Sequence, residues 1–524
     1  MTDSSLHLGN GGGLVERSPV LAWAKRALTM APASARRVPP RFFGTLVFFV
    51  ALIVLTVRGA ALLKDADTLW HVFVGTGILE TGRFPTVDTA SWTLAGSPWI
   101  AKEWLSQVIL AAAHRAGGWP LVALTAAAAA ALALALIARE AATRLSPAIA
   151  ALIAAAAFTL VAGHTLARPH VLAWPVMIGW TILLMRAAED GRAPSPFAAI
   201  LMALWANLHG SYLLGLALIP AFGLEALLRA PASRRTETAL GWVLILVLAP
   251  AATMVHAYGP GALFAAGKVL GLGSAAAFVA EWAPTDLGKL SGGKIAILAG
   301  IAALVLSPGR LPPIRVALLI GLLDMAVSHE RHLAMLGLIA PLILIEPIAE
   351  RAGAGRMDGD RMGGDRMGGD RMDGAETGGR ASGFGLLATG AAALAALAFA
   401  GMAALGALTT RPDLLPIAAL DAAKAAGVTG QVFNEYEFGG TLITRGIPTY
   451  IDGRTELYGP DRLTTYVAAT GVSTPGTLEK VLSDSRIGWT LLRPDQPAAA
   501  LLDHLPGWQR IFADEVAVVH KRIP

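Results

Sequence analysis

Residues 43–71 read FGTLVFFVALIVLTVRGAALLKDADTLWH. The apolar run 43–63 is long enough to cross the roughly 30 Å hydrocarbon core of a bilayer as a single helix. An acidic motif with Asp65 and Asp67 follows directly after this run. The stretch therefore predicts a membrane protein whose first candidate chemical groups lie where a helix leaves the membrane.

The composition of the whole chain agrees with this interpretation. Of its 524 residues, 55% are hydrophobic and 15% are charged, which suits a bundle of many helices with an added soluble domain. The net charge of +5 comes from basic residues scattered in short loops, so we expect no nucleic-acid partner. Cysteine is absent, which excludes disulfides, thiolate metal sites and a cysteine nucleophile.

Eleven apolar stretches are predicted to span the membrane. They lie near residues 43–63, 118–138, 147–163, 170–187, 195–209, 211–229, 238–256, 293–307, 314–328, 332–349 and 384–408. The apolar segment 104–116 is shorter, and we interpret it as a helix at the membrane interface, with a twelfth span as the alternative. A twelfth span would place the basic loops outside, so the positive-inside rule favours eleven.

The distribution of basic residues predicts the orientation. Lysine and arginine are concentrated in the N-terminal segment 1–42 and in every second loop after it, for example at Arg310 and Arg315. We therefore expect the N-terminus in the cytoplasm and the C-terminal domain in the periplasm of a bacterial inner membrane. The first span has a long flank and should remain as a signal anchor. Every histidine except His7 then falls on the outer side.

Two segments follow the main bundle, which covers 43–349 and includes an outer loop at 64–103. The stretch 350–382 contains four near-copies of an Arg-Met-Gly-type unit and predicts a disordered cytoplasmic linker before the last span. Residues 410–524 alternate β-rich runs (QVFNE, TYIDG, WTLLRP, VAVVHK) with helical ones, which predicts a small α/β domain. The expected fold class is an α-helical polytopic membrane bundle of about 11 transmembrane helices with a small C-terminal α/β domain.

The outer loop contains the most informative polar residues. Asp65 and Asp67 could together bind a hard divalent cation, Mg²⁺ or Mn²⁺, or one of them could act as a general base. The alternative is structural, because Asp67 is a suitable N-cap for the helix predicted after it. Glu103 is a second candidate acid or ligand, with an ordinary surface charge as its alternative.

Two further groups of polar residues have both a functional and a structural interpretation. Asn207 and His209 lie at a span terminus, where they either line a site or bond neighbouring helices. In the C-terminal domain, Asp452, Arg454 and Glu456 alternate after a short run. Together with Glu435 and Tyr458 they form either a sugar-binding edge or a salt-bridged turn that holds the domain to the bundle.

Several short motifs occur in a fixed order along the chain. They read DADTLWH (65–71), PTVDTASWT (85–93), EWL (103–105), RPH (168–170), WANLHG (205–210), HAYGP (256–260), ERH (330–332), FNEYEFGG (433–440) and YIDGRTELYG (450–459). In this order, over about residues 45–520, the chain resembles the GT-C superfamily of membrane glycosyltransferases, and more closely a group of largely uncharacterised bacterial GT-C-like proteins. The first motif departs from that group, because Thr68-Leu69-Trp70 stands where a tryptophan pair is expected.

The resemblance implies transfer of a sugar from a polyprenyl-phosphate carrier, with Asp65 or Asp67 as the catalytic carboxylate that activates the acceptor or holds a metal. It also implies substrate-binding roles for residues of the other motifs. These residues are His71, Glu103, Arg168, His170, Asn207, His209, His329, Arg331 and His332. Arginine suits a phosphate because its planar guanidinium donates two parallel hydrogen bonds. For arginines at helix ends, the structural alternative is that the side chain extends toward water to keep its charge solvated.

The sequence therefore predicts a membrane glycosyltransferase, moving a hexose or pentose from a polyprenyl-phosphate donor to a lipid, glycan or protein acceptor on the periplasmic side. Two other classes of protein are alternatives. One is a transporter or flippase of lipid-linked sugars, which would need a polar path to the cytoplasmic loops. The other is a non-catalytic envelope-assembly protein that keeps the GT-C shape.

Overall fold

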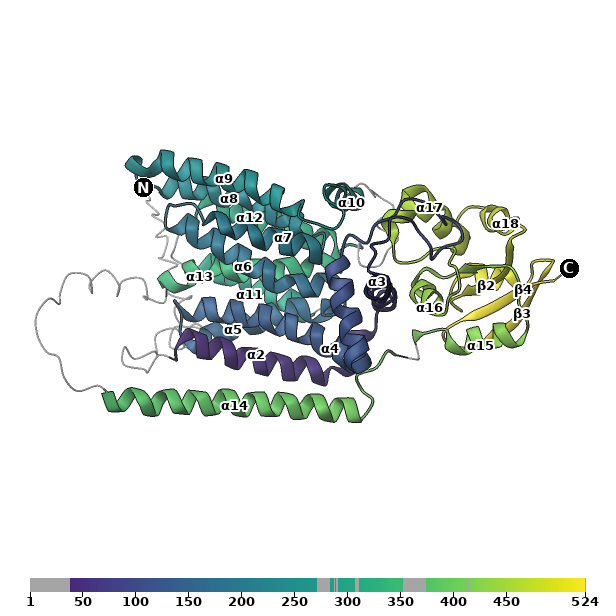
Figure 1. Ribbon diagram of the computed structural model, residues 1–524, viewed down its shortest axis with the longest axis horizontal. Helices are drawn as coiled ribbons and strands as arrows, with labels where there is room; N and C mark the ends of the chain where they lie inside the picture. Colours follow the sequence, from purple (N-terminus) through teal and green to yellow (C-terminus); the bar gives the residue numbers. More distant parts are fainter. Residues whose placement is uncertain are drawn as a thin grey trace, which may run out of the picture.

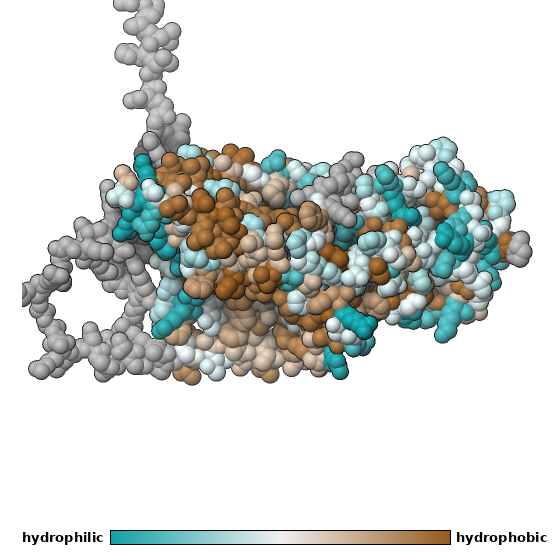
Figure 2. All heavy atoms as spheres, turned by 45° about the horizontal axis from the view of Figure 1, so that its top comes forward, coloured by the Kyte–Doolittle hydropathy of each residue, from teal (hydrophilic) through white to brown (hydrophobic). Residues whose placement is uncertain are grey.

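A computed structural model describes residues 38–270, 283–286, 288, 291–306, 311–351, 374–411 and 414–523. It contains a bundle of long helices and a smaller domain that packs against one end of that bundle (Figure 1). The visible surface of the bundle is largely hydrophobic, and that of the smaller domain is mostly hydrophilic (Figure 2). Exposed apolar side chains on the bundle, such as Leu152 and Phe197, suit contact with lipid rather than water.

The helices of the bundle overlap all eleven predicted spans. They are α2 (Pro40–Val57), α4 (Trp104–Ala142), α5 (Pro147–Val161), α6 (Pro169–Glu189), α7 (Ala199–Leu208), α8 (Tyr212–Arg229), α9 (Arg235–Thr253), α11 (Gly292–Leu306), α12 (Pro313–Ser328), α13 (Leu333–Arg351) and α14 (Gly374–Ala404). Within the described ranges, eight helices are long and apolar enough to cross a membrane, so the chain is a multi-pass membrane protein. The remaining three are shorter, and the number eleven stays a prediction.

Helix α4 has two arms that meet at a pair of glycines. The backbone leaves helical geometry at Gly117 and Gly118, and Gly118 has a φ of 64°, which glycine adopts without steric cost. The first arm packs on α3 (Asp67–Thr81), where Gly75 lies directly against the backbone of Gln107. The segment 104–116 is therefore a helix distinct from the span that follows, and its place at the membrane interface stays a prediction.

The outer loop connects the bundle to the C-terminal domain. One backbone bridge pairs Ser91 with Thr449 of that domain. The buried Asp88 forms an ion pair of 2.6 Å with Arg454, which also contacts Asp452 at 2.7 Å. These buried, mutually satisfied charges fix the domain on the loop.

The C-terminal domain has the predicted α/β character. Its helices are α15 (Ile417–Ala425), α16 (Gly439–Thr444), α17 (Thr455–Thr470), α18 (Thr477–Leu482) and α19 (Pro497–Leu502), and its strands are β1 (Gln431–Asn434), β2 (Ile487–Leu492), β3 (Trp508–Ala513) and β4 (Val518–Arg522). The sheet order is β1-β2-β4-β3, with β1 and β2 parallel and the other pairs antiparallel.

One predicted strand is wrong. The run TYIDG (449–453) is not part of the sheet, because side chains and the outer loop take its backbone hydrogen bonds. Asn434 donates to the carbonyl of Ile451 at 2.9 Å and accepts from the N–H of Tyr450 at 2.7 Å. The N–H of Thr449 donates to the carbonyl of Ala90.

The predicted linker 350–382 is shorter than expected at both ends. Helix α13 runs to Arg351 and α14 begins at Gly374, so residues 374–382 are helical rather than disordered. Extending an existing helix costs little, because each added residue gains a hydrogen bond. Residues 352–373, with most of the repeat, lie outside the described part of the chain, as does the N-terminal segment up to residue 37.

The far end of the bundle is joined by buried ion pairs. Arg315 of α12 is completely buried and contacts Glu225 at 2.9 Å, Glu346 at 2.8 Å and Glu189 at 3.1 Å. Arg229 contacts Glu225 at 3.0 Å and Glu346 at 3.3 Å. The carboxylates belong to α6, α8 and α13, so the pairs tie these helices to α12.

Candidate active site

Asp65 and Asp67 lie between the end of α2 and the start of α3, at the end of the bundle that carries the C-terminal domain. The short 3₁₀ helix Gly59–Leu63 ends just before them. The N-cap of α3 is Ala66 rather than Asp67, and Asp67 is in the first turn. Asp65 accepts the N–H of Asp67 on Oδ1 at 2.8 Å. The structural alternative of Asp67 as a cap is therefore wrong, because Asp65 accepts the free N–H.

Arg168 connects the two carboxylates. Its guanidinium contacts Asp65 Oδ2 at 2.9 Å and Asp67 Oδ2 at 3.0 Å, and all three side chains are less than 20% exposed. Arg168 is the N-cap of α6, with Pro169 as the first helical residue, so its backbone is extended and ends the loop from α5. The RPH motif therefore places a cation opposite the DAD motif.

The C-terminal domain approaches these carboxylates closely. A Cβ atom added to Gly453 would lie 2.0 Å from Oδ1 of Asp67, and one added to Gly440 would lie 2.2 Å from the carbonyl oxygen of Ala66. Side chains larger than glycine therefore do not fit at these two positions without movement. The DAD motif thus lies at the interface of the two parts.

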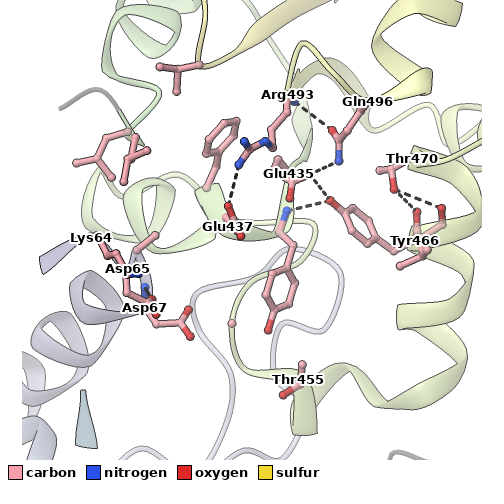
Figure 3. Close-up of a pocket in the computed structure, with 18 of the residues that line it drawn as sticks. Lys64, Asp65, Asp67, Glu435, Glu437, Thr455, Tyr466, Thr470, Arg493 and Gln496 are labelled. Carbon is pink, nitrogen blue, oxygen red and sulfur yellow. Dashed lines mark hydrogen bonds and ion pairs between the residues drawn. The ribbon is translucent and has the colours of Figure 1, made fainter. Parts of the chain in front are cut away.

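A cavity of about 610 Å³ opens between the bundle and the domain, with Asp65 and Asp67 in its wall (Figure 3). The bundle side contributes Lys64, Asp65, Ala66, Asp67, Arg168 and Arg331, and the domain contributes residues that include Glu435, Tyr436, Glu437, Gly453, Thr455, Tyr466, Arg493 and Gln496. The two carboxylates face the polar side chains of the domain across this space. We refer to it as the domain-side cavity.

A second cavity, of about 230 Å³, reaches into the end of the bundle and is lined by many of the predicted residues. Those residues are His71, Glu103, Arg168, His170, His209, Arg331 and His332. Leu213, Met325 and Met335 add an apolar part to its lining. Arg168 and Arg331 line both cavities, so these two cations lie at the boundary between them. We refer to this space as the bundle-side cavity.

Burial favours the neutral form of two histidines in the bundle-side cavity, His71 and His209. Burial, reinforced by the nearby Arg168, lowers the pKa of His71 well below its ordinary value. Gln107 lies 3.3 Å from Nδ1 of His71, and donation by its amide group assigns the ring proton to Nε2. Burial also lowers the pKa of His209, whose Nε2 is 3.4 Å from Glu103. These rings can therefore donate hydrogen bonds without carrying charge.

The cavity also contains an ion pair. Lys102 contacts Glu456 of the C-terminal domain at 2.6 Å. Burial alone would lower the pKa of Lys102, but the neighbouring Glu456 outweighs it and the pKa is raised. Burial raises the pKa of Glu103. The lysine therefore stays charged, whereas Glu103 is easier to protonate than a surface glutamate.

Two predicted residues lie outside both linings. Asn207 donates to the carbonyls of Ala203 and Val255 and accepts from the indole of Trp104 at 2.6 Å. These contacts agree with the structural alternative predicted for Asn207, in which it bonds neighbouring helices. His329 stacks edge-on against His332, with ring centroids 5.3 Å apart, and is itself in neither lining.

The polar edge predicted in the C-terminal domain is a salt-bridged turn. Asp452 accepts hydrogen bonds from Thr449, Tyr458 and Arg454, and all four side chains are buried. Glu456 is bonded to Lys102. Of the residues in that prediction, Glu435 lines the domain-side cavity and Glu456 the bundle-side one.

Sequence reasoning missed Lys102 and Gly453. Lys102 directly precedes the recognised EWL motif, and Gly453 lies inside YIDGRTELYG. Its charge and its position beside that motif could have identified Lys102 as a candidate site residue. The role of Gly453 depends on its contact with Asp67, which no local pattern reveals.

The two carboxylates do not fit a divalent cation in this arrangement. Arg168 occupies the position between Asp65 and Asp67 that such an ion would take, and Asp65 accepts bonds on both of its oxygens. Among the residues that the structure describes, no group of three or more histidine, aspartate or glutamate side chains could hold a metal. We therefore assign no step to a metal ion, and the Mg²⁺ or Mn²⁺ site stays a prediction.

No protein-family model matches the sequence, and no curated protein matches it. Solved structures do match. One is the archaeal oligosaccharyltransferase AglB from Archaeoglobus fulgidus, in complex with an inhibitory peptide and a dolichol-phosphate. The match has a TM-score of 0.50 at 10% sequence identity and covers 86% of this chain and 69% of that one.

A second match is ArnT from Cupriavidus metallidurans bound to undecaprenyl phosphate, with a TM-score of 0.44, 14% identity, and coverage of 92% of this chain and 98% of that chain. At these identities the likeness concerns the fold alone. The resemblance drawn from the sequence motifs is confirmed at that level: the chain has a GT-C-like fold, a polytopic helical bundle with a C-terminal α/β domain.

Proposed function

We propose that the protein is a membrane glycosyltransferase that moves a sugar from a polyprenyl-phosphate donor to a hydroxyl-bearing acceptor on the periplasmic face. The observation that carries the proposal is the position of Asp65, Asp67 and Arg168 at the boundary of two cavities. A carboxylate base beside cations is the combination that glycosyl transfer from a phosphate ester requires. The solved GT-C structure contains dolichol-phosphate, which supports a lipid-linked donor.

The bundle-side cavity suits the phosphate of the donor. Arg168, Arg331 and Lys102 line it, and the neutral rings of His71 and His209 can donate hydrogen bonds. Its apolar part, formed by leucine and methionine side chains, suits the first carbons of a polyprenyl chain. The departing phosphate would thus meet cations and donors that are already in position.

The reaction would be a single displacement. Asp67 takes the proton from the acceptor hydroxyl, and the hydroxyl oxygen attacks the anomeric carbon of the sugar. The bond from that carbon to the phosphate oxygen breaks, and polyprenyl phosphate leaves with the electron pair. Asp65 accepts bonds from Arg168 and from the backbone of Asp67, so we assign it to positioning.

The buried ion pairs at the far end of the bundle disfavour the transporter alternative. Arg315 and its three glutamates connect four helices, so a polar path between α6, α8, α12 and α13 would have to separate them. Breaking a buried pair of this kind costs about 3–5 kcal/mol.

The direct test measures release of polyprenyl phosphate by purified full-length protein supplied with polyprenyl-phosphate hexoses and pentoses, together with a periplasmic glycan extract. We expect Asp67→Asn to lower the rate at least about a hundredfold, because it removes the general base. Asp461→Asn, on the exposed surface of α17, is the matched control and should leave the rate unchanged. Retention of the wild-type rate in Asp67→Asn would refute the assignment.

A further inference from the structure

The two parallel strands of the C-terminal domain end at the domain-side cavity. Glu435 follows β1 directly and Arg493 follows β2, and the strands pair side by side, with Asn434 opposite Leu491. Ligands of open α/β sheets bind in the crevice at the carboxyl ends of parallel strands. The carboxyl ends of β1 and β2, where a ligand is expected to bind, therefore face Asp65 and Asp67.

Three polar side chains form a connected group at this edge. Oε2 of Glu435 accepts from the hydroxyl of Tyr466 at 2.8 Å and from the amide of Gln496. The Tyr466 hydroxyl in turn accepts the N–H of Tyr436 at 2.9 Å. Figure 3 shows these side chains together on the domain side of the cavity. We call Glu435, Tyr466 and Gln496 the polar triad.

The burial of the triad calls for an explanation. Glu435 is only 7% exposed, and burial raises its pKa. A buried carboxyl group costs free energy even when it is bonded, and no ion pair to Glu435 is found among the described residues. The triad does not fix the domain to the bundle, because the Asp88–Arg454–Asp452 and Lys102–Glu456 contacts do that elsewhere.

The charges around the triad favour a neutral ligand. Arg493 is paired with Glu437 at 3.0 Å and Arg168 with both aspartates. The other two cations of the lining, Lys64 and Arg331, lie on the bundle side, across the cavity from the triad. Glu435 itself would repel an anion when ionised. Carboxyl, phenol and amide groups side by side offer both donors and acceptors, which is what adjacent sugar hydroxyls need.

We propose that the polar triad is the acceptor subsite and that it binds a neutral, hydroxyl-rich glycan. This proposal rests on the proposed glycosyltransferase function, because the triad would present an acceptor hydroxyl to Asp67 across the cavity. The bundle-side cavity binds the donor and the C-terminal domain selects the acceptor. A peptide acceptor is the competing class, and it becomes an outcome of the test.

The experiment uses full-length protein in nanodiscs and measures binding of N-acetylchitotriose, maltotriose and an uncharged, hydroxyl-free peptide by saturation-transfer NMR. We expect saturable binding of at least one of the two glycans to the wild type. Gln496→Ala and Tyr466→Phe should each weaken it about threefold to tenfold, the effect of losing a hydrogen bond between neutral groups. Glu479→Gln, on the exposed face of α18, is the matched control and should bind as the wild type does.

Binding of undecaprenyl phosphate to the same samples, followed by native mass spectrometry, separates the two proposals. Variants that lose the glycan but retain the lipid support the triad as an acceptor subsite. Wild type that binds neither glycan, variants that bind as tightly as the wild type, or selective binding of an uncharged hydroxyl-free peptide would overturn it. If the wild type binds glycan but no lipid, the donor assignment fails while the triad stands as a glycan site.

Discussion

Gly453 lies so close to Asp67 that a Cβ atom at this position would be 2.0 Å from Oδ1 of the carboxylate. The glycine belongs to the C-terminal domain and the aspartate to the first outer loop. The position of the domain on the bundle therefore determines the position of the proposed base. The domain is thus part of the proposed active site, because it contacts the proposed base directly.

This contact predicts the effect of Gly453→Ala. The added methyl group must displace Asp67 or the domain, and a misplacement of about 1 Å lowers catalytic rates by about a hundredfold. We expect a loss of that size in the release of polyprenyl phosphate, with the protein still folded in the membrane. Gly77→Ala is the control, because nothing lies within 4 Å of the added carbon. Equal rates in the two variants would contradict the contact.

Arg168 should not be replaceable by lysine. Its planar fork contacts Asp65 and Asp67 at once, whereas a lysine offers a single point charge. Losing one charge-assisted bond costs about 1.5–3 kcal/mol, so the turnover of Arg168→Lys should fall about tenfold to a hundredfold. Arg192→Lys, in an exposed pair with Asp190, serves as the control. Wild-type turnover in Arg168→Lys would show that the fork has no role.

The far end of the bundle predicts a stability effect without a catalytic one. Arg315→Met leaves three carboxylates without their shared partner, and one of these, on Glu225, is 1% exposed. Removing one partner of a buried pair costs about 3–5 kcal/mol, so the melting temperature should fall markedly. Adding Glu225→Gln should restore part of it. A melting temperature equal to that of the wild type would show that these pairs contribute nothing to stability.

Stability should depend on the neutral state of His71. Its pKa in the folded protein is lowered well below 6.5, the ordinary value that we take for the unfolded chain. As the pH falls, the unfolded chain therefore binds a proton at His71 before the folded protein does. The free energy of unfolding is unaffected by this group above about pH 6.5 and decreases below it. Melting temperatures between pH 8 and 5 should fall at the acid end, and less so in His71→Asn. His504→Asn, at an exposed position, should follow the wild-type curve.

Much of the site could be predicted from local motifs. The DAD, RPH and ERH motifs named Asp65, Asp67, Arg168 and Arg331, and the structure brings these residues to one cavity wall. Apolar length alone predicted the helices, because a span needs about 20 apolar residues whatever its neighbours are. These features depend on short stretches of sequence, which is why they could be found without a structure.

The remaining features depend on contacts between distant residues. Lys102 and Glu456 are 354 residues apart and no spacing rule relates them. The run TYIDG has the composition of a strand, but the Asn434 side chain and the outer loop take its backbone hydrogen bonds. The motif WANLHG leaves Asn207 either in a substrate site or as a bond between helices, and its amide contacts with two carbonyls and an indole favour the second. Tertiary contacts decided each of these outcomes.

Metal dependence provides the last prediction. Arg168 stands between Asp65 and Asp67 and supplies the positive charge that a divalent cation would otherwise provide. We therefore expect transfer by the wild type to continue in excess EDTA. Removing the guanidinium in Arg168→Ala should abolish transfer. Added Mg²⁺ or Mn²⁺ should then restore part of it by occupying the vacated position between the carboxylates. Loss of wild-type transfer in EDTA that Mn²⁺ reverses would show instead that the working enzyme holds a metal there and that Arg168 withdraws to admit it.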